Sequence, residues 1–361
     1  MEKSVSIIIP VLASQSFAMR SDTPLVLHAV CGRSMLGYAI DTASDLTDLP
    51  VVVTAGECSS SVQEHGVQAG VIHQLADDQS SAFNFLQAAL HLSTDFEYLI
   101  LFPANLPLVT GATLQDMIQY TDNQQLDAVL LSASQTEFME PGHRALCVRV
   151  KWLSAFLSMH RSQLEAIPIQ ALDLWSLLAA QQAKKQLFQP GRPEEIMAVT
   201  DRITLAEAEK AMRLRINRFH MENGVTLIDP AQTYIGPEVC IEQDTVIYPG
   251  NVLEGTTVIG RGCMLYPNNR LNHSQVGERV ILQSSVILES SIGDESTVGP
   301  YAYIRPGSEI GSRVRIGDFV EIKKSVIGEG TKVSHLTYIG DAQLGKEINV
   351  GCGVVFVNYD G

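Results

Sequence analysis

Apolar residues recur every six positions along the second half of the chain. The period holds from Ile235 to Leu271, resumes at Ile292 after one irregular stretch, and continues with single phase shifts to Phe356. Neither a helix nor an alternating strand repeats in this way, whereas a parallel β-helix does, because each short strand turns one aliphatic side chain inward. The inward positions are Ile235, Ile241, Ile247, Leu253, Ile259, Leu265, Leu271, Ile292, Val298, Ile304, Ile310, Ile316, Ile322, Ile327, Val333, Ile339, Leu344, Val350 and Phe356. Glycines are expected at turns, where a positive φ is cheap for glycine: Gly236, Gly260, Gly293, Gly299, Gly311, Gly317 and Gly328.

The first half follows a different pattern, in which short apolar runs alternate with longer mixed segments. Buried parallel strands are predicted for SIIIPVL (6–12), VVVTAG (51–56), YLILFPA (98–104) and DAVLLSAS (127–134). Helices are predicted between them for MLGYAIDTASDL (35–46), AFNFLQAALHL (82–92) and GATLQDMIQYTDN (111–123). This alternation is typical of a layered α/β sheet with crossover helices, in which ligands bind beyond the carboxyl ends of the strands.

Between the halves, residues 201–222 predict one long helix, because no Pro or Gly interrupts them and Asn223-Gly224 follows as a stop signal. We therefore expect three parts: a sheet domain at 1–200, a connector helix at 201–224 and a β-helix at 225–361.

Composition narrows the function. The chain has 361 residues, is 45% hydrophobic and carries a formal net charge of −15. Nucleic-acid binding is not expected, because a polyanion needs a basic face, and an anionic substrate would need a local cluster of Arg and Lys. The apolar run near the N-terminus is too short for a membrane span, so a cytoplasmic protein with no membrane partner is expected. The six cysteines form no CxxC pair, which favours reduced, buried thiols over a metal site or disulfides.

Four segments carry a family resemblance. They are SDTPLVLHAV (21–30), GVTLIDPAQTYIG (224–236), VGPYAYIRPGS (298–308) and the segment from DFVEIKK to VNYDG (318–361). Together they resemble the bifunctional bacterial enzymes that join an N-acetylglucosamine-1-phosphate uridyltransferase to a glucosamine-1-phosphate N-acetyltransferase. The resemblance is strong from about residue 198 onward and weak between residues 45 and 197. It implies an α/β nucleotidyltransferase-like (Rossmann-type) domain, a connector helix and a left-handed parallel β-helix of hexapeptide repeats.

The same resemblance implies a homotrimer with its acetyl-transfer site between subunits, using acetyl-CoA and glucosamine-1-phosphate to feed cell-envelope precursor synthesis. His335 would be the general base, since the attacking amine must be neutral and histidine titrates near neutrality. The other implied roles fall to Arg305 and Lys323 (sugar phosphate), Tyr338 and Asn349 (sugar), Asn358 and Tyr359 (sugar and acetyl group), the Cys352 backbone N–H (oxyanion) and Glu321 (electrostatic support). Taken singly, each residue has a simpler alternative as a solvated or packing side chain.

The first half departs from the family pattern where ligands would bind. The family loop LAAGKGTRM is LASQSFAMR here, at residues 12–20, so that Ser14 and Ser16 replace glycines and Gln15 replaces a lysine. A second family lysine is Leu25, the QLGTG segment is DDQSS at 77–81, and the GYGR motif is absent.

The metal positions differ as well. Asn105 in FPANLPL replaces a Mg²⁺-binding aspartate, and Thr200 in VTDR replaces a second ligand. Mg²⁺ prefers anionic oxygens, so its binding is doubtful, no metal site is expected, and uridyl transfer is predicted to be lost.

Three hypotheses stay open: an acetyltransferase with an inactive sheet domain, a fully bifunctional enzyme, and a non-catalytic scaffold. Retention of His335 and its companions favours the first. Because family members continue for several more coils, we also expect the natural chain to extend beyond Gly361.

Overall fold

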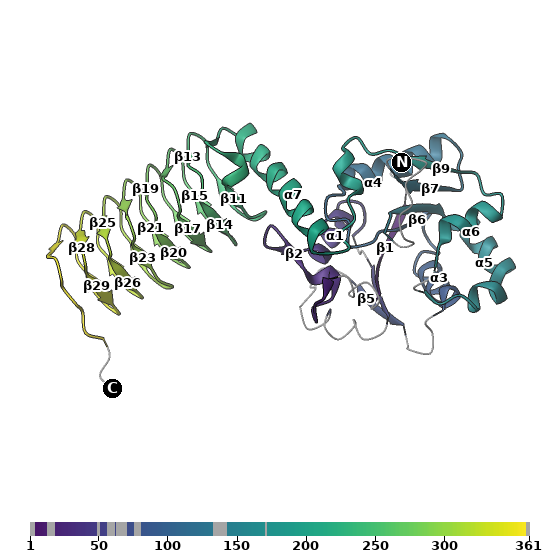
Figure 1. The fold of residues 1–361 in the computed structure, drawn as a ribbon, viewed down its shortest axis with the longest axis horizontal. Coiled ribbons are helices and arrows are strands. Elements are labelled where there is room, and N and C mark those ends of the chain that lie inside the picture. Colours follow the sequence, from purple (N-terminus) through teal and green to yellow (C-terminus); the bar gives the residue numbers. More distant parts are fainter. Residues whose placement is uncertain are drawn as a thin grey trace. The chain divides into compact units, whose positions relative to one another are not determined.

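The computed structural model describes residues 4–12, 19–48, 51–55, 62, 71–75, 81–132, 143–169 and 172–358. The chain forms two compact units, Met1–Glu209 and Lys210–Gly361 (Figure 1). The division falls within helix α7 (Arg202–Glu222), the helix predicted from the sequence. No helix within the described ranges combines the length and apolar character needed to cross a membrane.

The first unit is built on a seven-stranded sheet in the order β5-β4-β1-β6-β8-β7-β9. Its strands are β1 (Val5–Leu12), β4 (Val51–Ala55), β5 (Val71–Leu75), β6 (Tyr98–Leu101), β7 (Ala128–Leu131), β8 (Leu146–Arg149) and β9 (Lys185–Phe188). Its helices are α1 (Met35–Ser44), α3 (Ala82–His91), α4 (Gly111–Asn123), α5 (Val150–Glu165) and α6 (Leu174–Ala180). A small hairpin, β2 (Ala29–Val30) and β3 (Arg33–Ser34), follows the short 3₁₀ helix η2 (Leu25–Leu27). A second 3₁₀ helix, η5 (Pro193–Ile196), precedes α7.

All four predicted strands and three predicted helices of this unit are present, and the four strands run parallel to one another, but a further strand, β8, was not predicted. Strand β8 runs antiparallel to both β6 and β7. Its LCVR sequence is almost fully buried, as a central parallel strand would be, so composition alone does not reveal its direction.

The apolar runs of this sheet follow from burial on both faces. Along β1, Ile7 and Ile9 belong to one core cluster and Ile8 to the other, and all three are 0% exposed. Helix starts are defined by polar caps: the Ser34 hydroxyl accepts from the Gly37 N–H at 3.0 Å, and Ser81 accepts from Asn84 at 3.3 Å. The sheet's strand ends are thereby held in place beneath the connecting loops.

The second unit is a left-handed β-helix of three parallel sheets, which winds away from α7 in Figure 1. The first sheet contains β10 (Thr226–Leu227), β13 (Val246–Ile247), β16 (Met264–Leu265), β19 (Ile281–Leu282), β22 (Thr297–Val298), β25 (Arg315–Asp318), β28 (Lys332–His335) and β31 (Asn349–Val350). The second contains β11 (Tyr234–Ile235), β14 (Val252–Glu254), β17 (Arg270–Asn272), β20 (Val286–Leu288), β23 (Tyr303–Ile304), β26 (Glu321–Lys323) and β29 (Tyr338–Gly340). The third contains β12 (Cys240–Ile241), β15 (Val258–Ile259), β18 (Gln275–Val276), β21 (Ser291–Ile292), β24 (Glu309–Ile310), β27 (Val326–Ile327) and β30 (Gln343–Leu344), and the 3₁₀ helix η6 (Pro230–Gln232) precedes β11.

The predicted aliphatic residues form the core of this β-helix. Leu253, Leu271 and Ile287 stack in register in successive coils, and each is 0% exposed. The irregular stretch of the sequence is therefore one shorter coil: Leu271 pairs with Ile287, sixteen positions on, whereas Leu253 pairs with Leu271, eighteen positions on. Shortened turns carry a residue in the left-handed region, such as His273 (φ 47°).

The predicted reason for the glycines is wrong for six of the seven. Among them only Gly299 has a positive φ, of 106°. Five of the others lie where adjacent coils approach closely: a Cβ on Gly260 would lie 2.7 Å from the Gly277 carbonyl carbon, and one on Gly293 would lie 2.6 Å from that of Gly311. These five positions exclude a side chain for want of space, not because of backbone conformation, whereas Gly236 has room for a Cβ, with its nearest atom at 3.4 Å.

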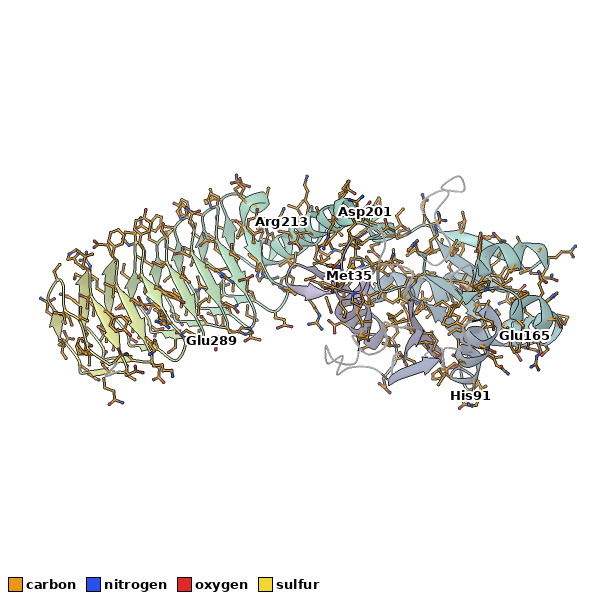
Figure 2. The ribbon with its side chains drawn as sticks, turned by 60° about the horizontal axis from the view of Figure 1, so that its bottom comes forward. Met35, His91, Glu165, Asp201, Arg213 and Glu289 are labelled. Carbon is orange, nitrogen blue, oxygen red and sulfur yellow. The ribbon has the colours of Figure 1, made fainter. Side chains whose placement is uncertain are left out.

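Helix α7 begins just after Asp201 and includes Arg213, both of which are labelled in Figure 2. At its start, the Asp201 carboxylate accepts from the Ile203 and Thr204 N–H groups, and these hydrogen bonds, Thr204's first, lower the pKa of Asp201. Towards its end, the buried Asn217 amide donates to the Pro230 and Thr233 carbonyls at 2.6 and 2.9 Å. The C-terminal part of α7 is thereby fastened to the first coil of the β-helix.

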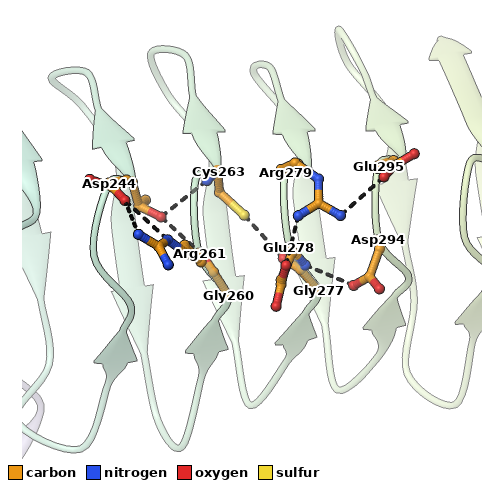
Figure 3. A network of polar contacts seen from close by, with 10 residues as sticks. Asp244, Gly260, Arg261, Cys263, Gly277, Glu278, Arg279, Asp294 and Glu295 are labelled. Atoms are coloured by element: carbon orange, nitrogen blue, oxygen red, sulfur yellow. Dashed lines mark hydrogen bonds and ion pairs between the residues drawn. The ribbon is translucent and has the colours of Figure 1, made fainter.

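One corner of the β-helix carries charged residues of both signs in successive coils (Figure 3). Arg261 bonds to Asp244, and Arg279 bonds to Glu278 and to Glu295. All these groups are about half exposed, so each pair adds little to stability. Because opposite charges meet only when the coils are correctly aligned, the row favours one register.

Candidate functional site

His335 lies at the end of β28, directly beside Asp318 at the end of β25. Its Nδ1 is 2.5 Å from Asp318 Oδ1, and the two side chains are 56% and 36% exposed. An ionised carboxylate only accepts hydrogen bonds, so Nδ1 must donate, which leaves Nε2 as the acceptor of the ring. The hydrogen bond from His335 lowers the pKa of Asp318, so this group stays charged well below neutral pH.

A second polar group lies on the adjoining sheet. Tyr303, Glu321 and Tyr338 occupy the same register position on β23, β26 and β29. Arg305, just after β23, donates from Nη1 to Glu321 Oε1 at 2.8 Å. This hydrogen bond raises the pKa of Arg305, and in the ligand-free chain it holds the guanidinium over the face of the sheet.

Asp341 joins three of the predicted site residues. Lys323 Nζ lies 3.3 Å from Asp341 Oδ2, and the Asn358 amide donates both to Asp341 and to the Tyr338 hydroxyl. The Asn358 hydrogen bond is the largest cause of the lowered pKa of Asp341, and Lys323 adds to it. Arg305, Lys323, Tyr338 and Asn358 therefore form one polar surface, held by Glu321 and Asp341.

The turn that carries His335 lies next to this polar surface along the chain. Only Leu336 and Thr337 separate β28, which ends at His335, from β29, which begins at Tyr338. Thr337 is buried, and its hydroxyl donates to the His335 carbonyl at 2.7 Å. The backbone beside His335 is thus fixed, while its imidazole faces outward. The His335 imidazole can therefore accept or donate a proton beside an anion bound at Arg305 and Lys323.

Two predicted residues lie elsewhere on the coil, and one lies outside the described residues. Asn349 pairs with Lys332, at the end of β28 opposite His335. Cys352 follows β31 and is exposed, one coil beyond His335. Tyr359 lies outside the described residues. Within one chain, Asn349 does not share a face with the polar surface, because opposite ends of a strand point towards different corners.

Asp318 and Asp341 were missed by the sequence analysis. Each is separated from its partner by about one coil: Asp318 precedes His335 by seventeen positions, and Asp341 follows Lys323 by eighteen. A separation of about one coil was the signal in the sequence that could have identified these two aspartates. The expectation of buried thiols also needs correction, because Cys147 and Cys263 are buried but Cys240 and Cys352 are exposed on outward positions of the β-helix.

In the sheet unit, folding brings together the two positions, Asn105 and Thr200, at which the family resemblance implies metal ligands. Asn105 is 1% exposed, and its amide nitrogen lies 2.7 Å from His143 Nδ1 and 3.0 Å from the Val199 carbonyl. Thr200 directly follows Val199, and its N–H donates to the Thr204 hydroxyl. The Asn105 amide nitrogen therefore has two partners, whereas its Oδ1 is buried without a hydrogen-bond partner among the described residues. The sequence analysis did not single out His143.

Mg²⁺ prefers several hard, anionic oxygens, and Asn105 and Thr200 supply no charge at the two positions where the family has its ligands. Here the amide N–H groups of Asn105 face the ring and carbonyl that neighbour the expected site. Over the described part of the chain, no group of three or more His, Cys, Asp or Glu could hold a metal ion. Residues 13–18 and 77–80, which include Ser14, Gln15 and Ser16, lie outside the described residues, whereas Leu25 is buried.

The fold and the site together define a hexapeptide-repeat transferase joined to a nucleotidyltransferase-like sheet unit. The model of the family "Bacterial transferase hexapeptide (six repeats)" matches residues 289–324. The bifunctional protein GlmU of Clostridium novyi is 41% identical over 382 residues, covering 97% of this chain and 83% of that protein. The GlmU of Clostridium acetobutylicum is 40% identical over the same shares. A solved cytidylyltransferase from Leptospira borgpetersenii covers 60% of this chain and 88% of its own, with 12% identity and a TM-score of 0.44.

The chain therefore belongs to the family of bifunctional GlmU proteins. This confirms the predicted family and fold class. The identity of the relatives extends across both units of the chain.

Proposed function

We propose that this protein transfers the acetyl group of acetyl-CoA to the amine of glucosamine-1-phosphate, within UDP-N-acetylglucosamine biosynthesis. The observation that carries the proposal is a carboxylate-paired His335 beside a surface with two cations. As the amine nitrogen bonds to the acetyl carbon and the carbon–sulfur bond breaks, Nε2 of His335 takes the amine proton. That proton then passes to the departing sulfur, which leaves as CoA thiol.

Arg305 and Lys323 would bind the sugar phosphate. In the ligand-free chain each is paired with a carboxylate, Glu321 or Asp341, which orients the cation but leaves it about a third exposed. A phosphate carries more charge than a carboxylate and can recruit both cations at once. Tyr338 and Asn358 would contact the sugar, and the N–H of Cys352 would bind the carbonyl oxygen as charge develops on it.

An exposed apolar row supports a homotrimer with the site between subunits. Tyr301, Phe319 and Leu336 are 61%, 57% and 58% exposed, and the rings of Tyr301 and Phe319 stack at 5.4 Å. The row runs beside Asp318 and His335, so a second copy covering it would reach the reacting groups. Asn349 and Tyr359 would then complete the site from a neighbouring copy. We place this activity in the cytoplasm, where acetyl-CoA is available.

Uridyl transfer is proposed to be lost, although the relatives are named bifunctional. The supporting observation is that an uncharged amide, Asn105, stands at the position expected for a metal-binding carboxylate, with its nitrogen bonded to His143 and to the Val199 carbonyl. The fully bifunctional enzyme is the competing reading, and it would have to bind its metal ion through neutral oxygens such as Asn105 Oδ1, which has no hydrogen-bond partner among the described residues.

Paired assays on one preparation of the protein test the proposal. CoA release is followed with acetyl-CoA and glucosamine-1-phosphate, and pyrophosphate release with UTP, N-acetylglucosamine-1-phosphate and Mg²⁺. CoA release alone is the expected result. Pyrophosphate release would restore the bifunctional reading, and silence in both assays would favour the non-catalytic scaffold.

A further inference from the structure

We infer that Asp318 is a positioning residue that sets the tautomer and orientation of His335 for acetyl transfer. The inference rests on the proposed function for its reaction, but its geometric part can be measured without turnover. No contact of Asp318 with substrate is involved, because the residue acts through the Nδ1 side of the ring.

The β-helix is locally modified at this pair. Strands β25 and β28 each span four residues, and their pairing extends beyond Arg315–Lys332 and Ile316–Val333 to Asp318–His335. Neighbouring strands of the same sheet, such as β19 and β22, pair over two positions only. The strand pairing therefore continues to the point where it sets the aspartate directly beside the histidine.

Two further contacts hold the pair together. Gly317 allows the close approach, because a Cβ there would lie 2.7 Å from the Ser334 carbonyl carbon. The Asp318 carbonyl accepts from the Leu336 N–H at 3.1 Å. Backbone contacts thus flank the side-chain hydrogen bond on both sides, which limits rotation of the imidazole.

The charged group nearest to the His335 imidazole is the Asp318 carboxylate. The other charged residues of these strands, Arg315 and Lys332, lie opposite each other in the register at the other ends of the strands. The residues that follow each member of the pair, Phe319 and Leu336, are apolar. Seventeen positions after His335, about one coil on, the chain has Cys352. When Nε2 takes the amine proton, the positive ring is therefore stabilised chiefly by the Asp318 carboxylate.

The test measures Asp318→Asn in the natural background and in a His335→Ala background. In the natural background we expect kcat for acetyl transfer to fall about 10- to 100-fold, with both KM values within about twofold. In the His335→Ala background the same change should have no further effect, because Asp318 acts through the ring. Glu329→Gln, which removes a carboxylate paired with Arg313 and Lys346 at another corner, is the matched control and should leave kcat unchanged.

A second readout is the ¹⁵N NMR spectrum of the histidine-labelled chain, with His335 identified by its loss in His335→Ala. The natural protein should show His335 protonated at Nδ1 when neutral, and Asp318→Ala should shift it towards the Nε2–H form. An unchanged tautomer, an unchanged kcat, or an equal loss of kcat in the His335→Ala background would each overturn the inference. Absence of acetyl transfer in the natural protein would instead count against the proposed function, while the spectrum would still decide the pairing.

Discussion

The two units of this chain differ in the charge of the side chains at their candidate sites. In the β-helix, each functional cation or base is paired with a carboxylate: His335 with Asp318, Arg305 with Glu321 and Lys323 with Asp341. In the sheet unit, the position where the family has a metal-binding carboxylate holds the uncharged amide of Asn105, which contacts His143 and a backbone carbonyl.

The difference lies in what each site can exchange for a ligand. Exposed ion pairs are weak, so an anionic substrate can replace a carboxylate partner at little cost. The buried Asn105 amide would lose two hydrogen bonds if it turned, and its Oδ1, which has no hydrogen-bond partner among the described residues, is an uncharged oxygen. The β-helix site is therefore ready for an anion, whereas the sheet site offers a neutral amide oxygen where the family has a carboxylate.

Removing the proposed general base, His335, should give the largest effect on activity. It would leave the β-helix unit as inactive as the sheet unit is proposed to be. We expect His335→Ala to lower kcat for acetyl transfer by about 10²- to 10⁴-fold, because proton removal from the amine is lost. Its side chain is 56% exposed, so the fold should be unaffected. His91→Ala, at the exposed end of α3, is the control, and CoA release is the measurement. Undiminished activity would refute the proposed role of His335.

Restoring the carboxylate that the family has at position 105 tests whether the sheet site can still form around a metal ion. Asn105→Asp should destabilise the unit by about 1–3 kcal/mol, because the carboxylate faces the Val199 carbonyl and cannot donate to it. Urea unfolding measures the change, and Asn123→Asp on the exposed end of α4 serves as control. Mg²⁺ should not recover the loss. Recovery by Mg²⁺ would mean that the site can still form around a metal.

Weakening the anion site should raise KM selectively. Arg305→Ala is expected to increase KM for glucosamine-1-phosphate about tenfold, since a charge-assisted hydrogen bond contributes about 1.5–3 kcal/mol, while KM for acetyl-CoA stays constant. Arg270→Ala removes a similar ion pair, with Glu254, from an earlier coil of the same sheet. Equal effects of the two variants would show that Arg305 acts only through the fold.

The smallest effects concern the cysteines. Cys352→Ala should leave kcat within about twofold, because the proposed contact uses a backbone N–H. Burial raises the pKa of Cys147 to about 12 and that of Cys263 to about 11, so neither thiol ionises appreciably at pH 8. A thiol reagent at pH 8 should therefore modify the exposed Cys240 and Cys352 and reach the buried pair only on unfolding. Rapid labelling of Cys147 in the folded chain would contradict this.

How much could be predicted differs between the fold and the site. The six-residue period predicted the β-helix because every short strand must bury one aliphatic side chain, whatever the turns do. His335, Arg305 and Lys323 were predicted from the family resemblance of the segments that contain them. Asp318 and Asp341 were not, because their partners lie a whole coil away and the coils here vary in length.

The sequence by itself therefore determined the period, the inward residues and the family to which the chain belongs. Only the tertiary structure decided which outward side chains meet, because turn lengths set the register between coils. The same holds for the sheet unit, where folding joins Asn105, His143 and Val199 and where strand pairing alone decides the direction of β8. Burial can be read from composition, but contacts between distant polar residues depend on the geometry that packing produces.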